Sequence, residues 1–247
     1  MRVRRIAAVA SATVLAAVAL SACGSDDGGA DNTKTEAKAL ADKAVEFAKK
    51  SGSMEAVGKG TEDGKAFEVK SCVNVTPEGK SESVKGSLTR DGRTAEVLTT
   101  GGKDYFKASA EFYILQAGQE TTDFDMAALS AALDGKWMVS DEEEPDDSAD
   151  FFEGNTDGVT KGEVTEFNGK KAVPLTKKDK DGKEKTVYVA AKGDPVVLGV
   201  LEVEDGTRTE TTISGVGKPC DVKAPAQEQT LTEDEVDKLF DEARQTS

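Results

Sequence analysis

The sequence contains no histidine, and this absence removes several classes of catalytic chemistry. Without an imidazole the chain cannot form a His-based triad, a Cys-His dyad or the commonest general base. Most zinc sites are excluded for the same reason. The motifs Gly-x-Ser-x-Gly, Ser-x-x-Lys and Cys-x-x-Cys and the phosphate-binding Walker loop are missing as well. We therefore expect no enzyme, no cofactor and no metal site.

Aromatic side chains are also scarce, at 5% of residues, which is thin for a sugar-binding groove. Carboxylates are abundant, with 47 Asp and Glu, but glycoside hydrolysis needs one pair held about 5–10 Å apart, and no pair stands out. Seven of them fall within residues 141–150, where self-repulsion and a proline predict a solvated loop. Weak calcium binding by this loop and hydrolysis through carboxylates alone remain alternatives.

There are only three cysteines, and the first, Cys23, directly follows a segment that is typical of a secretory signal. A start with three arginines precedes an Ala-, Val- and Leu-rich run from Ile6 to Leu20, which is short for a membrane-spanning helix of about 20 residues. The following Leu20-Ser21-Ala22-Cys23 is similar to the bacterial lipobox, in which the cysteine thiol receives a diacylglycerol and the chain is cut before it. A plain secretory signal with an accidental cysteine is the alternative.

The lipobox predicts a plan for the whole chain: a signal peptide at 1–22, a flexible tether at 23–35 and a single domain at 36–247. Each buried methylene of the acyl chains contributes about 0.8 kcal/mol to anchoring. The sequence thus predicts a protein attached through Cys23 to the outer side of the cell membrane.

The net charge limits the partners of such a domain. Loss of three arginines with the signal leaves 32 − 3 = 29 basic residues against 47 acidic ones, so that the net charge falls from −15 to −18. This surface argues against nucleic acid and against a basic patch for anionic membranes. We expect a monomer that its charge keeps apart from its neighbours.

The two remaining cysteines, Cys72 and Cys220, are an even pair in an exported chain, which most often forms a disulfide. Their Cα atoms must then lie within about 7 Å of each other, so an early strand and the end of the last strand would be neighbours. The alternative is two free thiols.

Hydrophobic periodicity predicts the fold class. Apolar residues recur with a helical period from Thr35 to Ser51, and strict alternation with glycine-containing turns follows. Thr232 and Glu235 form a capping box at the start of a last helix. We expect an α+β fold, a curved antiparallel sheet with helices packed on one face. The other expected segments are helices within 110–133 and strands near 67–75, 84–88, 95–99, 104–108, 162–167, 171–176, 186–191, 196–203 and 207–214, with a short apolar segment at 137–139.

Two short motifs carry a resemblance to a known family. The segments Gly102-Lys103-Asp104-Tyr105-Phe106-Lys107-Ala108 and Gly135-Lys136-Trp137-Met138-Val139, with the lipobox and tether, resemble actinobacterial cell-envelope lipoproteins of the LppX/LprG and LolA-like lipid-carrier fold. The resemblance implies a half-open barrel with an apolar cavity for acyl chains.

The same resemblance suggests candidate ligand-binding residues, which can equally be ordinary core residues: Tyr105, Phe106, Phe112 and Trp137. The first hypothesis is therefore a non-enzymatic lipoprotein that binds or carries a lipid or other apolar ligand. The second is an accessory interaction protein of the cell envelope that has no ligand cavity.

Overall fold

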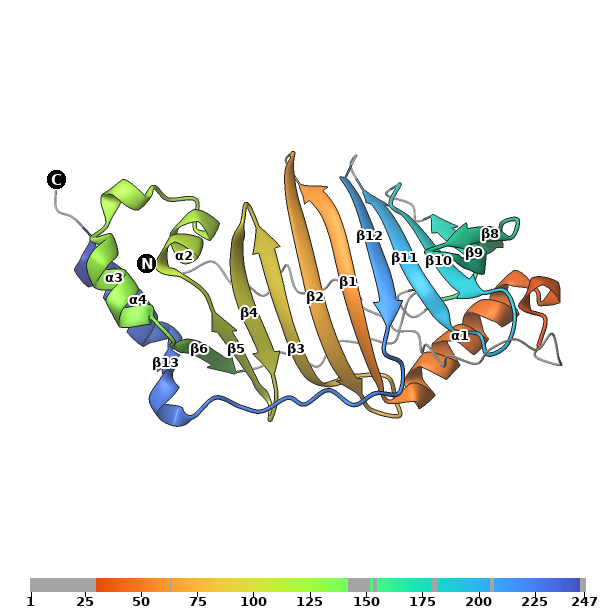
Figure 1. The fold of residues 1–247 in the computed structure, drawn as a ribbon, viewed down its shortest axis with the longest axis horizontal. Helices are drawn as coiled ribbons and strands as arrows, with labels where there is room; N and C mark the ends of the chain where they lie inside the picture. The colour runs from red at the N-terminus through yellow and green to blue at the C-terminus, as the bar shows by residue number, and fades with distance from the viewer. Residues whose placement is uncertain are drawn as a thin grey trace.

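One large sheet organises the molecule (Figure 1). The computed structural model describes residues 30–62, 64–141, 152, 155–178, 182–204 and 207–244. Within them, 13 strands form a curved sheet in the order β13-β6-β5-β4-β3-β2-β1-β12-β11-β10-β9-β7, with β8 paired to β9. All described strand pairs are antiparallel except β13 with β6. The predicted α+β class, an unclosed curved sheet with helices on it, is confirmed.

The elements have the following bounds. The strands are β1 (Ser53–Glu62), β2 (Lys65–Val75), β3 (Ser81–Arg90), β4 (Arg93–Thr99), β5 (Lys103–Lys107), β6 (Trp137–Asp141), β7 (Thr160–Lys161), β8 (Thr165–Phe167), β9 (Lys170–Lys178), β10 (Glu184–Ala190), β11 (Val197–Glu204), β12 (Thr207–Ser214) and β13 (Thr230–Thr232). The helices are α1 (Ala37–Ser51), α2 (Ala110–Gln116), α3 (Met126–Leu133) and α4 (Glu233–Ala243), with short 3-10 helices η2 (Asn32–Lys34), η3 (Thr121–Asp123) and η4 (Gln227–Gln229).

Strand β1 is the main element that the sequence pattern does not reveal. Gly58 and Gly60 interrupt its apolar alternation, so that only Met54 and Ala56 mark its buried side. These glycines have a packing role, because a Cβ on Gly60 would lie 2.7 Å from the ring of Phe67 on β2. A glycine in a strand often marks such a close approach.

The first helix and half of the sheet form the largest core. We call the face that carries Met54 and Ala56 the inner face, and the opposite face the outer face. Leu40, Ala41 and Ala44 of α1 are almost fully buried in one cluster with these two residues. The same cluster takes in the valine-rich strands β9, β10 and β11, and Figure 1 shows α1 beside that half of the sheet.

The other three helices gather at the opposite end of the sheet (Figure 1). Phe240 of α4 makes edge-on ring contacts with Tyr113 of α2 and with Phe124, at 6.0 and 5.9 Å between ring centroids. The apolar side chains of these three helices form a second core cluster with Met138 of β6, and Phe106 of β5 packs against it. Phe106 and Met138 pair with each other on the inner face. The predicted capping box of α4 is present, with the Thr232 hydroxyl accepting from the Glu235 N–H and the Glu235 carboxylate accepting from the Thr232 N–H.

A strap formed by residues 215–229 connects the two halves along the lower edge of the sheet (Figure 1). Cys72 of β2 and Cys220 of the strap form the predicted disulfide, with their Cα atoms 5.8 Å apart. Asn74 holds the same place, because its Oδ1 accepts from the Cys220 N–H at 2.9 Å and its Nδ2 donates to the Cys220 carbonyl at 3.1 Å. The strap is thereby fixed to the outer face.

The contacts of the domain extend into the segment predicted as a tether. Asn32 is 3% exposed, and its Nδ2 donates to the carbonyl of Ala190 at 2.8 Å and to that of Gly193 at 3.2 Å. Residues 30–32 therefore lie against the turn after β10, and the carbonyls of Thr33 and Thr35 accept from Lys161 of β7. The signal peptide, Cys23 and the start of the tether fall outside the described residues. Among the described helices, none has both the length and the apolar character needed to cross a bilayer.

Candidate functional site

The middle of the inner face lies between the two helix groups. Strand register places Val69 opposite Leu88 and Gly86 opposite Val97, and all four residues belong to the inner face. Val69, Leu88 and Val97 are half-buried, and none of them belongs to the core clusters of the described residues. We call these three side chains, with the half-buried Phe67, the central strip.

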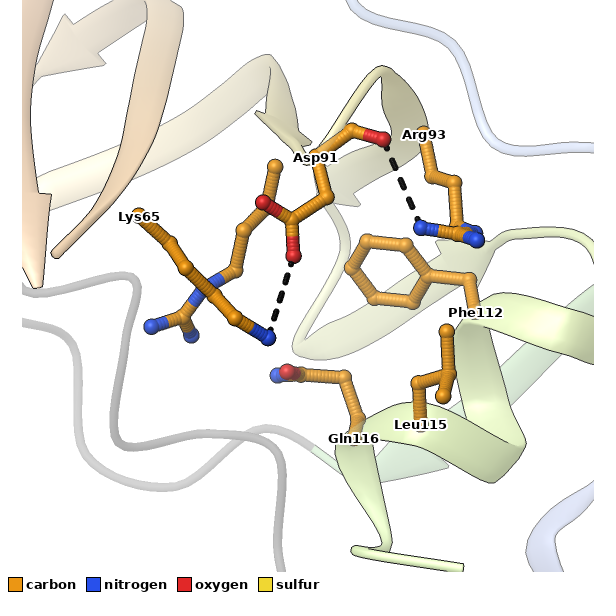
Figure 2. A pocket seen from close by; sticks show the side chains of 7 residues that line it. Lys65, Asp91, Arg93, Phe112, Leu115 and Gln116 are labelled. Carbon is orange, nitrogen blue, oxygen red and sulfur yellow. Dashed lines mark hydrogen bonds and ion pairs between the residues drawn. The ribbon is translucent and has the colours of Figure 1, made fainter. Parts of the chain in front are cut away.

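A pocket of about 210 Å³ lies at one end of the central strip, where the tips of β2, β3 and β4 face α2 (Figure 2). Its position depends on the Asp91-Gly92 turn, in which both residues have positive φ values of 51° and 76°. This turn, expected from the sequence, joins two antiparallel strands tightly and brings Arg90 opposite Arg93. The lining residues are Lys65, Arg90, Asp91, Arg93, Phe112, Leu115 and Gln116.

Each cation of the pocket has one carboxylate neighbour. Lys65 Nζ lies 3.3 Å from the Asp91 carboxylate, and Arg93 Nη2 donates to Glu111 at 2.7 Å. Arg90 pairs with Glu62. The hydrogen bond from Arg93 lowers the pKa of Glu111 and raises that of the guanidinium, so both groups stay ionised at neutral pH.

Arginine donors remain after these contacts. Arg93 Nη1 makes one long bond of 3.4 Å to the carbonyl of Asp91, and Figure 2 shows this contact beside the Phe112 ring. Arg93 Nε is buried and has no hydrogen-bond partner among the described residues. A guanidinium carries five N–H donors, so the donors of Arg90 and Arg93 that these contacts leave unused can bind an acceptor in the pocket.

The apolar wall of the pocket comes from α2. Phe112 is 3% exposed, and its ring lies 5.9 Å from that of Phe106, whereas Leu115 is 44% exposed at the pocket. Ser109 caps the helix by accepting from the Phe112 N–H at 3.2 Å, which fixes the position of this first turn. The site therefore combines cations on the strand tips with an apolar helix face.

The four ligand-binding residues expected from the family resemblance do not lie together. Phe106 lies on the inner face and Phe112 lines the pocket. Tyr105 and Trp137 belong to the outer face, in a cluster with Leu98 that also contacts Val222 of the strap. The Trp137 ring also lies beneath Lys107, whose Nζ is 4.6 Å from the ring centroid. No ligand contact of any of the four is shown.

The three cations of the pocket were not singled out by sequence. Lys65 is separated from Arg90 and Arg93 by a complete hairpin, so only the pairing of β2 with β3 brings them together. One local signal existed, namely two arginines flanking the Asp91-Gly92 turn in an otherwise acidic chain.

A metal site is not indicated by the described part of the chain. No group of three or more Cys, Asp and Glu side chains comes together there in a way that could hold an ion. Of the acidic run at 141–150, considered for calcium, residues 142–150 lie outside the described residues.

No protein-family model matches the chain, and no curated protein is similar to it in sequence. Solved structures are similar in fold. LprF from Mycobacterium bovis superimposes with a TM-score of 0.50 at 14% identity, covering 77% of this chain and 97% of LprF. The lipoprotein LppX from Mycobacterium tuberculosis gives a TM-score of 0.49 at 14% identity, covering 76% of this chain and 98% of LppX. The MucA/MucB complex of Pseudomonas aeruginosa gives 0.36 at 14% identity, covering 78% and 59%.

The similarity to LprF defines the class of fold. The chain has the α+β half-barrel fold of LprF, so the fold that the sequence motifs predicted is confirmed. Identity this low establishes the fold alone, because one fold can carry many functions. The function therefore has to be argued from the central strip and the pocket.

Proposed function

We propose that this chain is a membrane-anchored extracytoplasmic lipoprotein that binds or carries a lipid or another apolar ligand and catalyses no reaction. The observation that supports this proposal is the central strip, which places apolar side chains on the inner face of an open sheet between two separate helix groups. Apolar side chains beside a few convergent polar groups are typical of small-molecule sites. The LprF fold and the lipobox at Cys23 are consistent with it.

Lipid binding can be tested on full-length protein extracted gently from membranes. Organic extraction of the purified protein, followed by mass spectrometry, should detect a co-purified amphiphile. Val97→Gln and Leu88→Gln place polar groups in the central strip and should reduce the amount recovered. The matched control is Glu96→Gln, on the adjacent outer-face position, which should leave recovery unchanged.

The result that contradicts lipid binding also supports the other hypothesis. If wild-type protein repeatedly carries no amphiphile while partners are captured by mild crosslinking in membranes, the chain is an accessory interaction protein. If the Val97 and Leu88 variants then capture the same partners as wild type, the central strip has no part in that function.

Anchoring through Cys23 needs its own experiment, because residues 1–29 lie outside the described structure. Mass spectrometry of the mature protein should find Cys23 as the acylated first residue, after removal of 1–22. Cys23→Ala should leave the protein unacylated and release it from the membrane fraction. A mature chain that begins elsewhere and carries no lipid would refute the proposed signal peptide at 1–22, the anchor and a tether that starts at Cys23.

A further inference from the structure

We propose that the pocket at the end of the central strip binds the anionic headgroup, a phosphate or a carboxylate, of an amphiphile whose chain lies along the strip. This inference rests on the proposed function, since it names the chemical class of the ligand. Its basis is that arginine donors with few partners and an apolar wall line the same small cavity.

Three cations converge on the pocket, each paired with one carboxylate, in a chain that is acidic overall. The chain has a net charge of −15, yet the lining contains Lys65, Arg90 and Arg93 against the single carboxylate of Asp91. The charged neighbours of the lining, Glu62 and Glu111, are about half exposed, so solvent weakens their hold on the two arginines. The overall acidity argues against a broad basic surface, and this pocket is a local cluster of cations.

The donors suit an oxyanion better than a neutral group. Arg93 Nη1 makes only one long bond, to the Asp91 carbonyl, and Arg90 has one carboxylate contact for a guanidinium with five donors. Guanidinium groups bind carboxylates and phosphates through paired hydrogen bonds that are stronger than neutral ones. An anion could therefore be bound without breaking the existing ion pairs.

The size and position of the pocket suit the headgroup of a ligand better than its acyl chain. Its volume of about 210 Å³ is smaller than the roughly 300–1,000 Å³ of sites that enclose a drug-sized ligand. The apolar continuation lies next to it, because Phe67 pairs with Arg90, and Leu88 lies two residues before Arg90 on the same face. Phe112 and Leu115 form the opposite wall. A ligand with an acidic head and an apolar tail matches this order.

The inference can be tested by calorimetric titration of the full-length protein with three probes below their micelle concentrations. The probes are monododecyl phosphate, monolauroylglycerol as a neutral amphiphile of the same chain length, and inorganic phosphate. Wild-type protein should bind the dodecyl phosphate at least about tenfold more tightly than the neutral amphiphile, a preference expected from one charge-assisted hydrogen bond. Inorganic phosphate alone should bind more weakly than the dodecyl phosphate.

Variants assign the preference to the pocket. The double variant Arg90→Gln with Arg93→Gln should lose the tenfold preference for dodecyl phosphate and keep its affinity for monolauroylglycerol. The control Arg208→Gln, on the outer face, should change the affinity for neither amphiphile. If the double variant does not fold by circular dichroism, Glu111→Gln provides a second test, since it frees Arg93 Nη2 and should tighten binding of the dodecyl phosphate.

Each outcome decides one question. Equal affinities for the two amphiphiles in wild type, or a preference that survives in the double variant, would overturn the headgroup site and leave lipid binding intact. Phosphate that binds as tightly as its dodecyl ester would show a site for a free anion, which also overturns the inference. If neither amphiphile binds, the proposed function itself fails.

Discussion

The disulfide between β2 and the strap makes a quantitative prediction about stability. Cys72 and Cys220 are separated by 148 positions, and the chain-entropy model assigns a loop of that size about 5 kcal/mol of destabilisation of the unfolded state. Measured losses for native disulfides are about 2–5 kcal/mol, so we expect the Cys72→Ser, Cys220→Ser double variant to lose an amount in that range. This is a large share of the roughly 5–15 kcal/mol that stabilises a folded domain.

Urea denaturation of the soluble domain, followed by circular dichroism, measures both the loss and its origin. If the effect arises in the unfolded chain, the dependence of unfolding free energy on urea should become steeper, because a chain without the cross-link exposes more surface. Asn74→Ala removes the hydrogen bonds to Cys220 but keeps the disulfide, and should lower stability by about 1–3 kcal/mol with an unchanged slope. A loss below about 1 kcal/mol in the double variant, with an unchanged slope, would refute the entropic explanation.

Three further predictions concern other parts of the fold. Leu40→Ala empties a fully buried position of α1 and should cost about 2–5 kcal/mol in chemical denaturation, whereas the exposed Lys43→Ala should be nearly neutral; equal effects would contradict the packing of α1. Asn32→Ala removes the hydrogen bonds to the carbonyls of Ala190 and Gly193 and should cost about 1–3 kcal/mol in the same assay, and a neutral result would show that Asn32 does not stabilise the domain. The hydrogen bond from the Thr232 N–H lowers the pKa of Glu235 below its ordinary value. The cap therefore stabilises α4 at any pH above the ordinary pKa of a glutamate, and this stabilisation is lost as the pH falls through the lowered pKa. Glu235→Gln should remove this part of the acid sensitivity in melts recorded at several pH values.

The headgroup site can fail while lipid binding stands, because the two proposals depend on different residues. Loading of an amphiphile depends on the central strip, while preference for an acidic head depends on Arg90 and Arg93. Neither depends on Tyr105 or Trp137, whose outer-face cluster under the strap indicates a structural role.

The sequence by itself determined the features that involve residues close together in the chain. The helical period before Gly52, the Asp91-Gly92 turn and the capping box at Thr232 each depend on interactions within a few residues, and all three are present as predicted. Cys72 and Cys220 could be paired despite their separation because they were the two cysteines left after the lipobox.

Only the tertiary structure decided which strands are neighbours and which face is inner. Because successive side chains of a strand point to opposite faces, the sequence places Tyr105 and Phe106 on different faces of the sheet. It does not tell which of them faces the helices, because both faces are covered, one by helices and the other by the strap. Strand β1 was not predicted because glycines interrupt its pattern, and Gly60 makes room for Phe67 of the neighbouring β2. Strand β13 was not predicted because its partner β6 lies about 90 residues earlier. The cationic pocket has the same origin: long-range strand pairing unites Lys65 with Arg90, and packing of α2 closes the site, so its components have no shared signal in the linear chain.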